Sequence, residues 1–185
     1  MRTITTLALV LLLSLPPSLG LAQPSASNPE SERLRKELFL LLADVQSASA
    51  VLNARSSYDQ FMQEIGRINK RLTSIRSKYR VPLSRGDHKA LGEPISNACA
   101  ALYAAAGDWK QVRLAAIELA GAQRAVSQAA PWEADFYQRQ LQAAQIKHAE
   151  AQRLLTDHTK TALAAVHVAT KAQEESNRHA VAARK

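Results

Sequence analysis

The feature that most constrains the fold of this chain is an apolar spacing that alternates between three and four residues along three long segments. Apolar residues at this spacing fall on one face of an α-helix and repeat as they do in coiled-coil heptads. The segments cover about 30–80, 91–129 and 131–182. The pattern therefore predicts long helices packed side by side at shallow angles. In the middle segment the stripe consists of Leu91, Ile95, Ala98, Leu102, Ala105, Trp109, Val112, Ala116, Leu119 and Val126, interrupted only by Gln123.

Turn signals divide this pattern into an antiparallel bundle. Pro82 and Gly86 mark the strongest turn, within residues 81–87, and Pro131 ends the second segment. Alanine supplies much of the apolar content and aromatic residues make up only 5% of the chain, a composition that suits closely spaced helices better than a sheet. We therefore predict an all-α fold, an elongated antiparallel three-helix bundle or coiled coil roughly 60–75 Å long, in a helical domain at 30–183.

The first segment leaves one alternative open. Its apolar stripe changes register by one residue near Arg55, Ser56 and Ser57, and Ser57 with Gln60 forms a weak capping box. The spacing favours one continuous helix from about 30 to 80 with a local defect. The alternative is a four-helix bundle with a break near residue 56.

The first 22 residues have the three parts of a cleavable secretory signal. Arg2 supplies positive charge, an apolar stretch covers Leu7–Leu13, and small residues lead up to Ala22. The apolar stretch is about a dozen residues long, shorter than the roughly 20 that a membrane-spanning helix needs. We therefore predict a signal peptide at 1–22, cut after Ala22, a polar linker at 23–29, and a protein that is exported to the periplasm or secreted.

The residue types that carry catalysis or bind metals are dispersed in this sequence. His148, His158 and His167 are ten and nine residues apart, whereas two ligands on one face of a helix need a spacing of three or four. HExxH, CxxC, GxSxG and phosphate-loop patterns are absent, and the one cysteine, Cys99, is expected to be a small buried apolar residue. We therefore expect no enzyme activity, metal, cofactor or small-molecule substrate.

Positive charge is concentrated in one window, residues 67–89. This window carries +7 of the chain's net charge of +8. One interpretation is structural, because cations near a helix C-terminus complement the helix dipole. The other is a basic hairpin tip that docks on an anionic surface. The candidate binding residues are Arg67, Lys70, Arg71, Arg76, Lys78, Arg80, Arg85 and Lys89.

These features favour a protein that acts by contact. We expect an exported, non-enzymatic protein of the cell envelope that serves as a scaffold, adaptor or chaperone through protein–protein contacts, a secretion-system component being one such role. Its partner is then another protein or a second copy of the chain. The alternative is a surface-binding module whose basic tip docks on anionic lipid or cell-wall polymer. Nucleic acid is not an expected partner, because no aromatic residues are interleaved with a basic strand.

Overall fold

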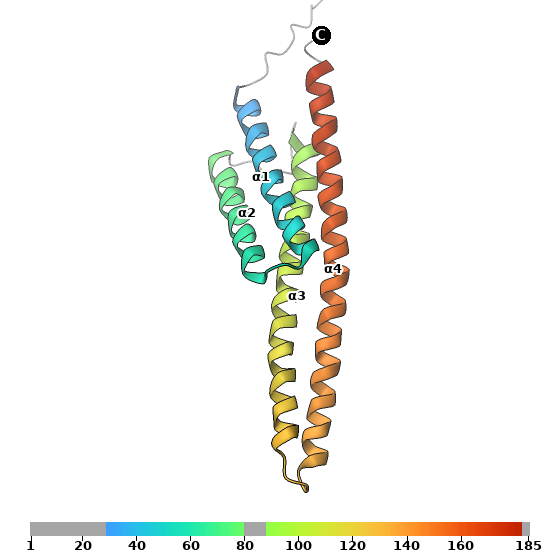
Figure 1. Cartoon of the computed structure of the whole chain (residues 1–185). Coiled ribbons are helices and arrows are strands. Elements are labelled where there is room, and N and C mark those ends of the chain that lie inside the picture. The colour runs from blue at the N-terminus through green and yellow to red at the C-terminus, as the bar shows by residue number, and fades with distance from the viewer. Residues whose placement is uncertain (1–28, 80–87, 183–185) are drawn as a thin grey trace, which may run out of the picture.

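The structure is a computed structural model that describes residues 29–79 and 88–182. Its four helices are α1 (Pro29–Ala54), α2 (Tyr58–Tyr79), α3 (Lys89–Gln128) and α4 (Ala134–Ala182). The described residues contain no strand, which confirms the predicted all-α bundle. Figure 1 shows that α1 and α2 form a short hairpin beside one half of a much longer hairpin of α3 and α4. At 1.5 Å per residue, α4 is about 73 Å long, so the molecule is a rod.

The chain breaks between α1 and α2, as the four-helix alternative predicted, and the expectation of a continuous helix over 30–80 is wrong. Arg55 takes a positive φ of 47° and its N–H donates to the carbonyl of Leu52 at 3.2 Å, an ordinary helix C-terminus. Ser57 caps the N-terminus of α2, because its hydroxyl accepts the N–H of Gln60 at 3.3 Å. Breaking the helix lets both apolar stripes, which differ by one residue in register, face the same core.

The core is aliphatic between α1, α2 and α3 and is lined by small residues on α4. Leu38, Leu42 and Ile95 are fully buried, whereas α4 contributes Ala162 and Ala169 at the same depth. An aromatic cluster closes the core where α1 turns into α2. There the ring of Phe61 stacks on Trp109 at 5.5 Å, and Tyr58 meets Trp109 edge-on at 5.9 Å. Small residues on α4 allow it to run close to α3 along its length.

One described helix, α1, is long and apolar enough to cross a membrane by length and composition. In the structure five of its six leucines are buried in the core, as in a core helix, and Leu40 is exposed. The predicted signal peptide at 1–22 and linker at 23–29 lie outside the described residues, except that Pro29 begins α1.

Candidate functional site

The feature of this fold most open to contact is the part of the long hairpin that extends beyond α1 and α2 (Figure 1). Beside the aromatic cluster, two polar contacts join the end of the short hairpin to the long one: Arg113 to Asp59 at 3.3 Å and Arg55 to Thr156 at 2.9 Å. Residues 114–154, here called the arm, lie past these contacts. Within the arm only Ala115 and Ala151 are buried, while several large apolar side chains face solvent. These exposed residues are Leu114, Ile117, Trp132, Phe136, Ile146 and Leu154.

The long hairpin has two faces, and α1 packs on one of them. The α4 side chains that bond to α1, or to Arg55 just after it, are Thr156, Thr170 and Asn177, which lie seven or fourteen residues apart and hence on one stripe. The ion pair of Lys147 with Glu118 at 2.6 Å bridges α4 and α3 on the opposite side. Leu154 lies one heptad beyond Lys147 and hence on the same side of α4. It is about 200° around the helix from Thr156, which faces α1. We call this opposite side the outer face. It carries Ala90, Asn97, Leu114 and Glu118 of α3 and Phe136, Lys147, Leu154 and Val168 of α4.

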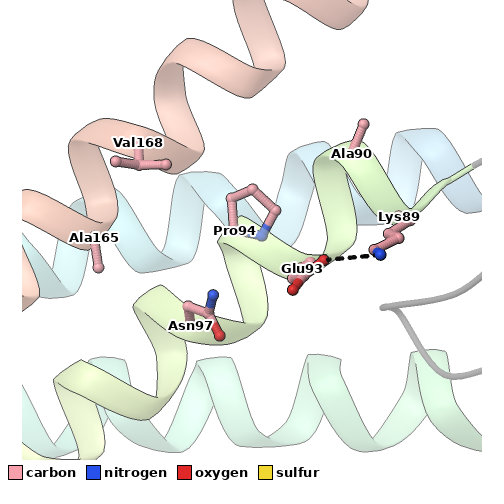
Figure 2. Close-up of a pocket in the computed structure, with 7 residues that line it drawn as sticks. All are labelled: Lys89, Ala90, Glu93, Pro94, Asn97, Ala165 and Val168. Atoms are coloured by element: carbon pink, nitrogen blue, oxygen red, sulfur yellow. Dashed lines mark ion pairs between the residues drawn. The ribbon is translucent and has the colours of Figure 1, made fainter.

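A groove opens on the outer face where α3 begins. Its volume is about 630 Å³, and Figure 2 shows Pro94 of α3 facing Val168 of α4 across it. Lys89 and Glu93 form an ion pair at its edge, with Nζ and Oε2 3.9 Å apart. The lining is otherwise mainly small and apolar. A volume of this size accommodates aromatic side chains.

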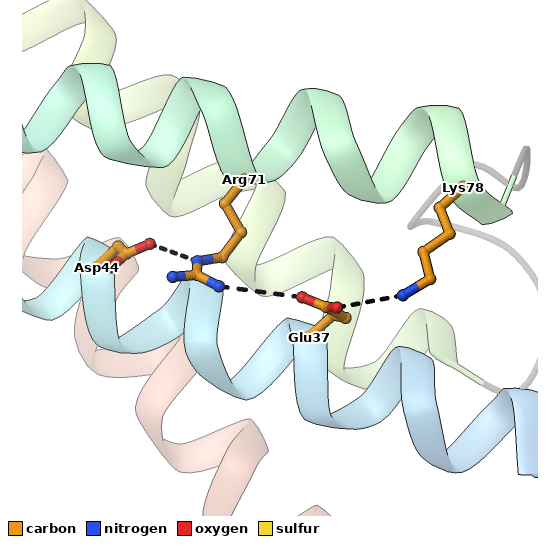
Figure 3. Close-up of polar contacts among 4 residues, drawn as sticks. All are labelled: Glu37, Asp44, Arg71 and Lys78. Carbon is orange, nitrogen blue, oxygen red and sulfur yellow. Dashed lines mark hydrogen bonds and ion pairs between the residues drawn. The ribbon is translucent and has the colours of Figure 1, made fainter.

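Part of the predicted basic window joins α2 to α1 (Figure 3). The Arg71 guanidinium donates to Asp44 at 2.6 Å and lies 3.9 Å from a carboxylate oxygen of Glu37, which in turn accepts from Lys78 at 3.4 Å. The two acids are seven residues apart on α1 and the two bases seven apart on α2. This is the arrangement of charged pairs that flanks an antiparallel coiled-coil interface. Arg71 and Lys78 therefore have a structural role in the four-helix part.

The structure brings some of the remaining basic residues together and separates others. Arg67, which pairs with Glu64 at 2.9 Å, lines a groove of about 360 Å³ with Lys70 and Arg71. Lys89 is on α3 and lines the larger groove instead. Arg76 is exposed on α2, and Arg80 and Arg85 lie outside the described residues. The window is thus not one continuous surface within the described chain.

Removing the Arg71 charge should weaken the attachment of α2 to α1. We expect Arg71→Met, which keeps most of the side-chain stem, to lower the free energy of unfolding by about 1 kcal/mol, since the pairs are only partly screened by solvent. Urea titration followed by circular dichroism measures this change. Arg76→Met is the matched control on an exposed position of the same helix and should leave the urea midpoint unchanged. Equal losses in the two variants would contradict the structural role of Arg71.

Cys99 is buried in the core, as the sequence predicted, and is not a candidate nucleophile. Burial raises the pKa of its thiol from 9.0 to about 11, although Arg76 opposes the shift. A buried neutral thiol is unreactive. We therefore expect negligible reaction with a disulfide reagent at pH 8 unless urea is present.

The same pKa shift makes a pH-dependent contribution to stability. Since the folded state favours the protonated thiol, the contribution is complete below pH 9 and is lost as the pH rises to about 11. The stability difference between the protein and Cys99→Ala should shrink over this interval in paired urea titrations. A difference independent of pH would show that the thiol titrates alike in both states.

Other polar groups in the described residues serve the helix contacts. His158 Nδ1 contacts Asp108 Oδ2 between α4 and α3. Within 29–79 and 88–182, no three histidine, cysteine or acidic side chains are grouped so as to hold a metal ion.

Sequence analysis did not identify the arm, nor the aromatic residues at its end. Trp132 is 85% exposed and follows Pro131 in the turn, while Phe136 is exposed in the first turns of α4. The signal was present, because an α1–α2 break makes the first two helices too short to cover the third and fourth. Comparison with protein-family models, with curated proteins and with solved structures finds no match for this chain.

Proposed function

We propose that this protein is an exported, non-enzymatic component of the cell envelope that acts as a scaffold, adaptor or chaperone by direct contact with proteins. The arm is the observation that carries this proposal. It extends from a well-packed four-helix part and exposes six large apolar side chains over 114–154. Exposed apolar surface concentrated in this way is typical of interaction sites. The proposed export rests on the sequence of residues 1–22.

The end of the arm has the chemistry of a protein-binding anchor. Tryptophan is among the residues that dominate the energetics of protein interfaces, and Trp132 is almost fully exposed. Between Arg124 and Arg139 the only charged residues are Glu133 and Asp135, so this end is locally negative in a chain of net charge +8. Local negative charge opposes docking on an anionic membrane and favours a protein surface with a basic rim.

Site-specific photo-crosslinking in the native cell tests this function. A photoreactive amino acid at Ile117, on the arm, should capture a defined protein that mass spectrometry identifies. The same amino acid at Met62, which is exposed on α2, is the matched control and should not capture that protein. Trp132→Ala should reduce the product if the arm is the binding surface. A product that is the same from both positions, or no product from the arm, would contradict the proposal.

The convergence of three basic side chains favours a second candidate function, binding to anionic lipid or cell-wall polymer. Arg67, Lys70 and Arg71 line one groove together with Glu37 and Asp44, which pair with Arg71, and Arg67 is largely exposed. Arg67→Gln with Lys70→Glu removes one charge of this groove and reverses another, and both residues lie outside the α1–α2 ion pairs. This variant should lose at least about tenfold in affinity for anionic vesicles, in a salt-sensitive manner, and keep its helicity. Lys171→Glu, at an exposed position of α4, is the control and should leave vesicle binding unchanged. Unchanged binding by the double variant would exclude this function.

A further inference from the structure

Three apolar features of the outer face lie at related heights along the rod. The ion pairs Glu118–Lys147 and Asp108–His158 fix the register of the antiparallel helices α3 and α4. In both pairs the two residue numbers add to about 265, so any residue of α3 faces the residue of α4 whose number completes this sum. Leu114 and Leu154 are therefore within about one helical turn of each other, on two adjacent helices of the same face. We call them the leucine pair. Both side chains are exposed, at 44% and 39%.

The leucine pair is midway between the aromatic end of the arm and the groove. Trp132 and Phe136 lie about 18 residues from it in one direction, a distance of roughly 27 Å along the helices. Pro94, at the centre of the groove, lies about 19 residues from it in the other direction, roughly 29 Å away. A half-turn about an axis through the leucine pair would therefore place the end of one arm at the groove of a second copy.

We propose that a second copy of this chain covers the outer face. The two long hairpins pack antiparallel about a two-fold axis at the leucine pair, and the aromatic end of each arm enters the groove of the other copy. Such a contact uses the same surface on both copies and is closed, so it yields a dimer and does not extend into a filament. The inference rests on the proposed function, because both assign the arm to contact with a protein. It identifies a second copy of the chain as one such protein.

Size and charge support this occupant. The groove of about 630 Å³ has room for the indole of Trp132 beside an aliphatic lining. Lys89 and Glu93 both line the groove and lie 3.9 Å apart, and Asp135 of the entering arm would compete with Glu93 for the Lys89 ammonium. The shared strip is roughly 55 Å long and 10 Å wide, so the dimer would bury roughly 1,100 Å² in total, which reaches the size of a specific interface.

The oligomeric state of the purified protein tests the proposal. Sedimentation equilibrium should give twice the mass of a single chain. Leu154→Glu brings two carboxylates together at the axis and should weaken the dimer at least about 100-fold. Ile146→Glu makes the same change on the side of α4 that points away from α3, where the side chain is 69% exposed, and should leave the dimer intact. Circular dichroism confirms that both variants remain helical.

Cysteine crosslinking tests the register. Ala134→Cys, at the end of the arm, and Asn97→Cys, in the groove, should be joined by a bismaleimide of roughly 10 Å span when the two variants are mixed, because each copy then supplies one partner and the two residues lie on neighbouring helices. Ala134→Cys alone should not crosslink, since the two arm ends would be roughly 54 Å apart. Leu154→Cys alone should crosslink, because two copies of the residue meet at the axis. Native Cys99 is 1% exposed and does not interfere.

The outcomes separate this inference from the proposed function. A monomer at about 100 µM overturns the dimer, given the affinity expected of an interface of this size. The proposed function survives that result if Ile117 still captures another protein in the cell. A dimer that Ile146→Glu disrupts and Leu154→Glu spares, or one that crosslinks through Ala134→Cys alone, overturns the outer-face arrangement. A dimer with the expected crosslinks but no other captured protein supports the inference and removes the adaptor role.

Discussion

Replacing Phe61 with alanine should lower the free energy of unfolding by about 3–5 kcal/mol, the range for truncating a buried phenylalanine. Phe61 is the largest of the fully buried side chains, and its ring stacks on Trp109 at 5.5 Å. It comes from α2 and Trp109 from α3, so the pair attaches the short hairpin to the long one. Urea titration followed by tryptophan fluorescence, in a Trp132→Phe background so that Trp109 is the reporter, and by circular dichroism would measure the loss.

Met62→Ala is the control for this prediction. Met62 is the next residue on α2 and is 38% exposed, so its truncation should change stability by no more than about 0.5 kcal/mol. Comparable losses in the two variants would show that the aromatic cluster does not anchor the short hairpin.

Enlarging Ala162 to leucine should destabilise the protein by about 1–3 kcal/mol through overpacking. Ala162 is fully buried on α4, and the spacing of α3 and α4 depends on small residues of this kind. The leucine has no space to enter unless the helices move apart or neighbouring side chains leave their preferred rotamers. A lower melting temperature with unchanged helical content is the expected observation.

Ala164→Leu tests whether the effect depends on position. Ala164 is two residues away and exposed on the same helix, so a leucine there should leave the melting temperature within about 2 °C. A stabilising Ala162→Leu would mean that α3 and α4 leave a void at this position.

The sequence was sufficient to predict the fold class, because spacing of three and four residues over such lengths is compatible only with packed helices. It did not decide whether residues 55–57 end a helix, since a change of register by one residue is accommodated either by a break or by a local distortion. The observed positive φ of Arg55 decides for the break. Once the break is known, the shape follows from helix lengths: α1 has 26 residues and α2 has 22, against 40 and 49 for α3 and α4.

The candidate sites were harder to predict because they depend on which helices become neighbours. Charge counting located the basic window but gave no indication that Glu37 and Asp44, 34 and 27 residues before Arg71, neutralise part of it. Their heptad spacing matches that of Arg71 and Lys78 and was a readable signal. The exposed Trp132 was not predictable in the same way. A tryptophan after a turn is equally suited to packing against that turn, and only the three-dimensional structure shows its exposure.

The bond between the two ends of the described chain has a consequence for biosynthesis. Arg35 donates to the carbonyl of Ser176 at 2.7 Å and to the side chain of Asn177 at 3.1 Å, more than 140 residues later. The α3–α4 hairpin depends on contacts between residues close in sequence to its turn. It can form from the turn outward as soon as both helices are synthesised. The buried leucines of α1, in contrast, are not fully removed from solvent until the C-terminal part of α4 is synthesised. During that interval the nascent protein resembles a client of holding chaperones more than a folded rod.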